Sequence, residues 1–293
     1  LFEERDPIYR DLADFVVPRK ADITKKRSQG EKRVERSFDS TAMHSAELLS
    51  ASLHGMLTNP STSWFSLRYT NDELDGNDEA NEWLQSAEKV LYRAFARSNF
   101  QEQIHELYHD LVVFGTGVMF VEEDENFLLR FSTRHISECY LSENEHGRVD
   151  TVYREFQMPA RACISRFGKE NVSQKMLKKA KESPFEFVTI CHATFFRDEY
   201  DTTKFNAENK PIASIYFDAE EQIILSESGF DDFPYMCPRF LKSSFEIGYG
   251  RSVAMVSLPD IQMLSAMSQT TIKAAQKQVD PPLLVPDDGF MLP

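Results

Sequence analysis

Apolar residues recur with helical spacing at both ends of this chain and with strand spacing in its middle. Spacings of three and four residues predict helices, and short runs rich in β-branched and aromatic residues predict strands. The helices are expected at residues 7–17, 39–57, 78–97, 100–114 and 160–182. The strands are expected at residues 64–69, 118–122, 127–131, 149–157, 185–196, 212–217 and 222–226. Because the strands are grouped and not alternated with helices, we predict an α+β fold.

The last predicted helix has sharp boundaries at both ends. A glycine-flanked turn at residues 248–252 precedes it, and we expect Pro259 to start it, since proline is tolerated in the first turn. It runs to about Gln278. Its apolar stripe is modest, and after Asp260 it contains no acidic residue. Asp280-Pro281-Pro282 ends the helix, and residues 283–285 are expected to begin a new strand.

Charge limits the classes of function. The 293 residues carry a formal net charge of −14, whereas tight binding of nucleic acid requires a basic surface. An acidic protein is therefore a poor DNA clamp. It is still suited to surround DNA and let it slide, since repulsion discourages sticking.

Cysteine content and hydropathy exclude two further classes. The four cysteines contain no C-x-x-C pair, so a zinc ribbon or a dense disulfide framework is not expected, and we interpret them as reduced thiols of an intracellular protein. No window reaches the roughly 18 consecutive apolar residues of a membrane helix. We therefore expect no membrane partner.

One short string resembles a metal site. His105-Glu106-Leu107-Tyr108-His109 is an H-E-x-x-H sequence, in which two histidines on one helical face bind zinc and the glutamate polarises the metal-bound water. Asp110 places a charge where such helices keep an uncharged residue, and no third ligand follows at a suitable position on the same helix. We favour a partly exposed helix surface, with a zinc hydrolase as the alternative.

No other chemistry is indicated. The chain has no G-x-S-x-G elbow and no glycine-rich phosphate loop, and its acidic run at residues 122–125 lacks the spacing of a calcium loop. That run is expected at a hairpin tip. The basic stretch at residues 19–36 is expected to be a connector, with a phosphate- or partner-contacting arm as the alternative. We predict that the protein is not an enzyme and has no cofactor.

Four sequence features, in this order, resemble the head-to-tail connector, or portal, proteins of short-tailed phages and prophages. The first is a helix that breaks at a proline, followed by a basic loop, at residues 11–36. The second is a small-residue helix leading to a proline and a tryptophan, at residues 39–67. The third is a helix–glycine–strand junction at residues 111–120. The fourth is the Tyr-Gly-Arg-Ser turn, Gly248-Tyr249-Gly250-Arg251-Ser252.

The resemblance implies a portal-protein fold. A helix-and-sheet wing domain would occupy residues 1–258, the first stem helix residues 259–278, and the start of a clip domain residues 279–293. The C-terminal part of such a protein would be missing here. The alternative within viruses is another virion structural or adaptor protein built from similar parts.

The resemblance also implies partners. The subunit would form a homo-oligomeric ring, usually a dodecamer, at a unique capsid vertex of the virion, after assembly in the host cytoplasm. Double-stranded DNA would be packaged and ejected through the ring. Terminase, tail adaptor proteins, and capsid and scaffold proteins would contact it.

Two sets of residues are candidates for these contacts. Those facing the DNA channel would lie on the stem helix: Gln269, Lys273, Gln276 and Lys277. The two lysines are equally suited to pair with acidic residues of the next subunit. Those docking partners at the clip would be Asp280, Pro281, Pro282, Asp287 and Asp288.

Overall fold

The computed structural model describes residues 2–20, 36–70, 77–201, 203–204, 206–242 and 248–281. The helices are α1 (Phe2–Val16), α2 (Thr41–Leu57), α3 (Asp78–Arg97), α4 (Phe100–Phe114), α5 (Ala160–Phe167), α6 (Gln174–Glu182) and α7 (Val253–Val279). The strands are β1 (Val118–Asp124), β2 (Leu128–Arg134), β3 (Cys139–Glu143), β4 (Val149–Pro159), β5 (Phe187–Phe196), β6 (Ile212–Asp218), β7 (Ile224–Phe230) and β8 (Tyr235–Met236). Single 3₁₀ turns are η1 (Pro18–Lys20), η3 (Ile136–Glu138) and η4 (Ala207–Asn209).

The strands form two antiparallel sheets, which confirms the α+β prediction. The smaller sheet has the order β2-β1-β8, and the larger is a meander in the order β3-β4-β5-β6-β7. The acidic run at residues 122–125 lies at the tip of the β1–β2 hairpin, where it covers the end of β1 and the start of the turn. There the Asp124 carboxylate accepts backbone hydrogen bonds from Asn126 and Phe127. None of the described helices is long and apolar enough to cross a membrane.

Three apolar clusters hold the body together. The largest lies where α1, α4, β1, β3 and the start of α7 meet, and it includes Tyr9, Phe114 and Val118, which are fully buried. The second packs α5 and α6 on the larger sheet. The third packs α4 against β1 and β2. The first cluster fixes α7 to the body, because Ala254, Leu258 and Ile261 belong to it.

The α3 and α4 helices have the predicted bounds, but the predicted strand at residues 64–69 was wrong. That segment is extended and lies against α3, where the backbone N–H and carbonyl of Phe65 both bond the Tyr92 hydroxyl, each at 2.8 Å. Side chains of a helix thus satisfy its backbone groups in place of a second strand.

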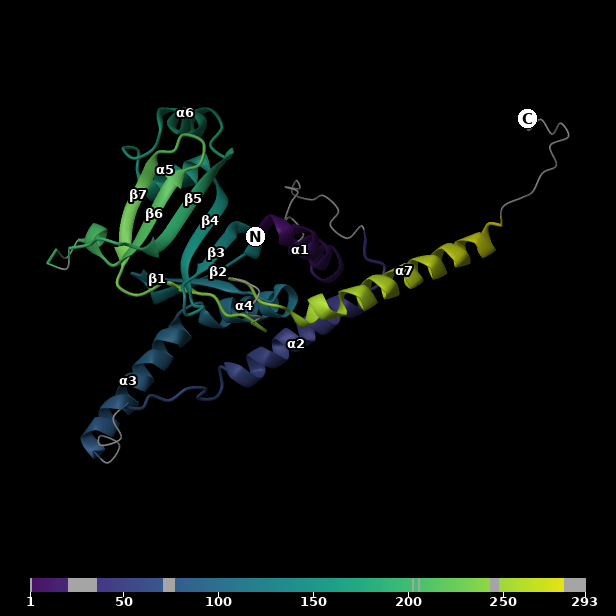
Figure 1. Ribbon diagram of the computed structural model, residues 1–293, viewed down its shortest axis with the longest axis horizontal. Helices are drawn as coiled ribbons and strands as arrows, with labels where there is room; N and C mark the ends of the chain where they lie inside the picture. The colour runs from purple at the N-terminus through teal and green to yellow at the C-terminus, as the bar shows by residue number, and fades with distance from the viewer. Residues whose placement is uncertain are drawn as a thin grey trace.

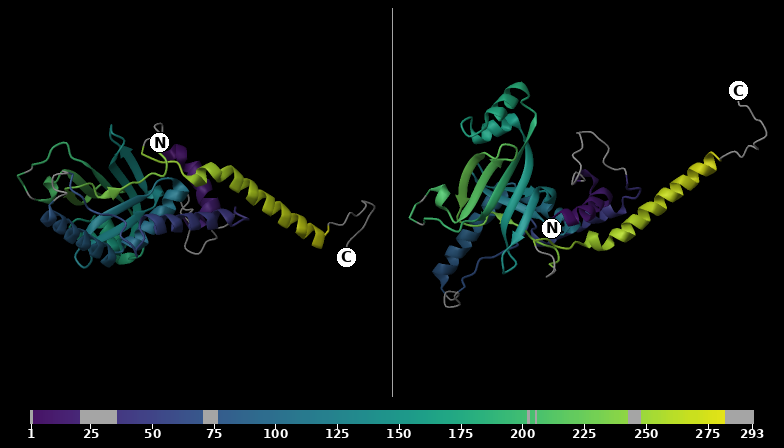
Figure 2. Two further views of the ribbon diagram at one scale, coloured as in Figure 1. Left: turned by 90° about the horizontal axis from the view of Figure 1, so that it is seen from below. Right: turned by 45° about the horizontal axis from the view of Figure 1, so that its top comes forward.

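Both prolines expected at helix starts lie inside helices. α1 begins at Phe2 and contains Pro7, and α7 begins at Val253 and contains Pro259. The prediction that α7 starts at Pro259 was wrong because another residue, Ser252, supplies the cap. Figure 1 and both views of Figure 2 show α7 leaving the body and continuing alone toward the C-terminal end.

Candidate assembly surface: a long helix and its anchor

Two glycine turns far apart in the sequence meet where α7 begins. Gly115 ends α4 with a left-handed φ of 76°, and a Cβ atom there would lie 2.5 Å from the carbonyl oxygen of Gly250. A Cβ atom on Gly250 would lie 2.4 Å from the carbonyl oxygen of Gly115. The backbone N–H of Gly250 donates to Thr116 Oγ1 at 2.7 Å. Glycine is required at both positions because each backbone occupies the space of the other's side chain.

Ser252 links this junction to the helix. Its hydroxyl accepts a hydrogen bond from the Met255 N–H at 2.9 Å, which caps α7, and donates to the Val113 carbonyl of α4 at 2.8 Å. The residue is fully buried. A serine cap satisfies one of the free N–H groups at a helix start, so it fixes both where α7 begins and how that end meets α4.

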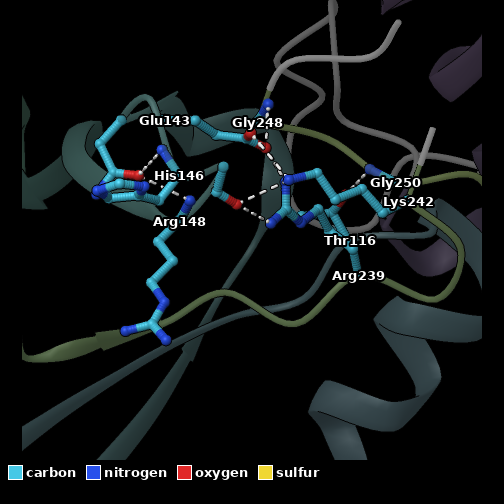
Figure 3. Close-up of polar contacts among 10 residues, drawn as sticks. Thr116, Glu143, His146, Arg148, Arg239, Lys242, Gly248 and Gly250 are labelled. Atoms are coloured by element: carbon cyan, nitrogen blue, oxygen red, sulfur yellow. Dashed lines mark hydrogen bonds and ion pairs between the residues drawn. The ribbon is translucent and has the colours of Figure 1, made fainter. Parts of the chain in front are cut away.

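A buried carboxylate holds the chain segment that leads into α7 (Figure 3). Glu143, at the end of β3, pairs with Arg239, lies 3.4 Å from Lys242 Nζ, and accepts the Gly248 N–H at 2.7 Å. Arg239 and Lys242 also donate to the Gly147 carbonyl, at 2.8 and 2.9 Å. The β3–β4 hairpin therefore bonds this segment both before residue 243, at Arg239 and Lys242, and after residue 247, at Gly248.

A second set of contacts holds α7 near its middle, at Ser265. Arg36 Nη1 bonds Asp11 at 2.8 Å and Asp14 at 2.9 Å, and these bonds raise the pKa of Arg36. The next described residues reach the helix: the Phe38 N–H donates to Ser265 Oγ at 3.0 Å. Of the predicted basic stretch 19–36, residues 21–35 lie outside the described residues. On either side of these residues, Lys20 and Arg36 each pair with acidic residues of the body.

Beyond these contacts, no described part of the chain buries α7. Every residue at 270–281 is exposed, and apolar side chains are among them: Ile272 is 46% and Val279 87% exposed. The helix of 27 residues is about 40 Å long. An isolated helix is marginal in water, since helices gain most of their stability by packing an apolar face. This half of α7 has no such packing against the described residues.

An apolar groove adjoins the same helix. It measures about 280 Å³ and runs between α2 and α7. Ala42, Ala46 and Leu49 line it from α2, and Ala254 and Ile261 from α7. The small residues noted in the sequence of α2 thus border open space on this side.

The predicted channel residues all lie on the free part of α7 or at its border. Lys273, Gln276 and Lys277 are exposed, and Gln269 is half-buried. Lys273 and Lys277 are four residues apart and share one face of the helix. Neither forms an ion pair with a described residue of this chain.

The predicted clip residues are only partly within the described structure. Asp280 is the C-terminal cap of α7, where its N–H donates to the Gln276 carbonyl at 2.9 Å, and Pro281 is exposed. Pro282, Asp287 and Asp288 lie outside the described residues, as does the predicted strand at residues 283–285. Two of the five clip candidates, Asp280 and Pro281, thus fall within the described residues.

The H-E-x-x-H string lies on α4, beside α2. Lys20 pairs with Glu106 at 2.9 Å and with buried Asp110 at 2.7 Å, and the His105 ring packs against His54. Burial lowers the pKa of His109, and the charge of Lys20 adds to that effect. Among the described residues no group of three potential ligands is placed to hold a metal. The glutamate is thus engaged in an ion pair and the string lacks a third ligand.

The anchor residues contributed by other parts of the chain were missed by sequence reasoning. Glu143, Arg239 and Ser265 carry no signal of their own, because their partners lie about a hundred residues or more away in the sequence.

The four cysteines are free, and burial raises the pKa of Cys139 to about 12 and that of Cys163 to about 11. These two thiols are therefore unreactive.

Comparison with known proteins bears on this surface. A family model described as bacteriophage head to tail connecting protein matches residues 2–292. The chain is 30% identical over 282 residues to a probable portal protein of Bordetella phage BPP-1, covering 95% of this chain and 51% of that protein. It is 28% identical over 280 residues to the portal protein of Salmonella phage epsilon15, covering 94% and 50%. The chain thus spans about half the length of the curated relatives it matches.

Proposed function

Because this chain belongs to the bacteriophage head-to-tail connecting protein family, we propose that it acts as part of a portal subunit. The family consists of structural virion proteins and not of enzymes, so the zinc-hydrolase alternative is set aside. We propose that the subunit forms a ring at one capsid vertex, with twelve copies as the expected number. Closed rings require heterologous contacts, in which one face of a subunit meets a different face of the next.

The unburied half of α7 is the observation that carries this proposal. A helix of about 40 Å with apolar residues at its free end is stable only when neighbours cover it. Stem helices packed side by side around an axis would provide that cover. The hydrogen bonds of Ser252 to α4 and of Phe38 to Ser265 give the helix a defined direction relative to the body.

The proposed division of the chain follows the sequence prediction. The wing is residues 1–258, the first stem helix residues 259–278, and the start of the clip residues 279–293. The first turns of α7 support placing the start of the helix with the wing, because Ala254, Met255 and Leu258 pack in the core of the body. The clip would carry the docking residues Asp280, Pro281, Pro282, Asp287 and Asp288 for tail adaptor proteins.

We propose that double-stranded DNA moves through the ring during packaging and ejection. Terminase would drive packaging, and capsid and scaffold proteins would surround the wing. The acidic net charge suits a conduit, because it prevents tight binding of the phosphate backbone. Gln269, Lys273, Gln276 and Lys277 are proposed to face either the channel or the next subunit.

Electron microscopy of the full-length protein tests the proposal. The expected result is rings with an axial hole. A homogeneous monomer at high concentration would contradict the proposed function, because that function requires a ring.

A further inference from the structure

A groove between α5 and α6 is basic, although the protein as a whole is acidic. Four of its eight lining side chains are cations and none is acidic: Arg161, Lys169, Lys178 and Lys181. Its floor is apolar, formed by Ile164, Leu177 and Ala180. The groove volume of about 490 Å³ is large enough for a bulky side chain.

The cations of this groove are largely uncompensated. Lys178 lies 3.9 Å from Glu182 of the same helix. Arg161, Lys169 and Lys181 are exposed, and none of them forms an ion pair within the part of the chain that the structure describes. A concave site with a cationic rim and an apolar floor fits an acidic segment that also presents a large apolar side chain.

Helix α3 presents such a segment. Trp83 is 64% and Val90 59% exposed, and both lie on the face that points away from the Phe65–Tyr92 contact. Glu79 and Glu82 are exposed one helical turn or less from Trp83 and pair with no described residue. Phe95 of the same helix packs against Trp64 and Phe100 in an aromatic cluster, whereas the Trp83 side chain is exposed.

The two surfaces lie at opposite ends of the body. In Figure 1 and in the right view of Figure 2, α6 is at one end and α3 at the other, and α7 extends away from one side of the body. One chain cannot join its own two surfaces in this arrangement. Two copies can join these surfaces, and repeating the contact builds a head-to-tail series of subunits.

We propose that the acidic face of α3 docks in the basic groove of α5 and α6 on the neighbouring copy. Trp83 fills the groove, and Glu79 and Glu82 pair with the cations on its rim. This inference rests on the proposed ring and names one of its subunit contacts. Buried aromatic anchors ringed by polar pairs carry most of the energy of protein interfaces.

Charge exchange in the full-length protein tests the contact. Glu79→Lys with Glu82→Lys, or Lys178→Glu with Lys181→Glu, should weaken ring formation by about tenfold or more, measured as ring fraction against concentration by sedimentation. Combining all four changes should restore rings, which a folding defect would not allow. Trp83→Ala should weaken assembly to a similar degree.

A matched control lies at the tip of the β1–β2 hairpin. Glu123→Lys with Glu125→Lys makes the same charge change at two exposed positions and should leave the ring fraction unchanged. If either charge-reversed double variant assembles like the wild type, the docking proposal is wrong while the connector function stands. The same holds if the variant that combines all four substitutions still fails to form rings. If the wild-type protein itself forms no ring, the proposed function fails and this contact with it.

Discussion

Single residues at the start of α7 have little freedom to change. Gly115 and Gly250 approach so closely that a Cβ atom on either would overlap a backbone oxygen, and backbone atoms cannot rotate away as a side chain can.

Buried Asp110, on α4, is constrained by its charge and not by its size. Burial raises its pKa to about 6, although the charge of Lys20 acts in the opposite direction. One constraint is steric and the other electrostatic, and they give separate predictions.

Gly250→Ala should lower the free energy of unfolding by more than about 2 kcal/mol, because α4 and the segment before α7 would have to separate. Gly55→Ala is the matched control. Gly55 lies in α2, and a Cβ atom added to it would meet no atom within 4 Å, so this change should stabilise by about 0.5–1 kcal/mol. Urea unfolding measures both variants, and equal effects would refute the steric account.

Lys20→Met should destabilise the fold by about 2–4 kcal/mol at about pH 7.5, because Asp110 would remain buried without its partner. Removing Lys20 raises the pKa of Asp110 further. A carboxyl group with a raised folded pKa stabilises the fold below its unfolded pKa of about 4, and this contribution is lost as pH rises through the folded pKa. The loss relative to the wild type should therefore shrink at about pH 5.

Urea unfolding of the wild type and of Lys20→Met at both pH values measures the difference in their free energies of unfolding. Lys273→Met, at an exposed site on α7, serves as the control and should change stability little at either pH. A deficit for Lys20→Met that stays constant between the two pH values would contradict the assigned role of Asp110.

Among the secondary-structure elements, α7 is half anchored and half free. Its first half is held by the Ser252 cap, by the core around Ala254 and by the bond to Ser265, whereas residues 270–281 are exposed. The direction of the free half is thus set by contacts in the first half. A weakened anchor should change where the free half points as well as the stability of the body.

Ser252→Ala should cost about 1–3 kcal/mol, because the Met255 N–H loses its cap and the Val113 carbonyl loses a buried donor. Ser257→Ala, on the same helix, is the control and should have an effect within about 0.5 kcal/mol. Thermal unfolding compares the two variants. A Ser252→Ala protein as stable as the control would show that the cap does not hold the helix.

Across the molecule, three of the described surfaces face different directions and are left open by the chain itself. The free half of α7, the groove of α5 and α6, and the outer face of α3 are separated by the body (Figure 1). A subunit with distinct exposed surfaces pointing in different directions suits a heterologous ring better than a two-fold dimer, which reuses one surface.

Lys273→Ala with Lys277→Ala should leave the stability of the body unchanged, since both side chains are exposed on the free half of α7. If the lysines face DNA, rings should form normally and the rate of DNA packaging should change. If they pair with acidic residues of the next subunit, ring formation should weaken first. Sedimentation and a packaging assay on the same preparation separate these outcomes, and an unaltered result in both would exclude the two roles.

The amino-acid pattern alone was enough to predict the α+β class, the bounds of α3 and α4, the approximate positions of the longer strands along the chain and the family resemblance. Local periodicity and turn residues carry this information, because they depend on neighbours within a few positions. Long-range packing instead set the start of α7 after Ser252 and not at Pro259, laid residues 64–69 against a helix, and left Trp83 exposed. Each of these outcomes depends on groups distant in sequence, such as Val113 for Ser252, and no local pattern encodes which distant groups will meet.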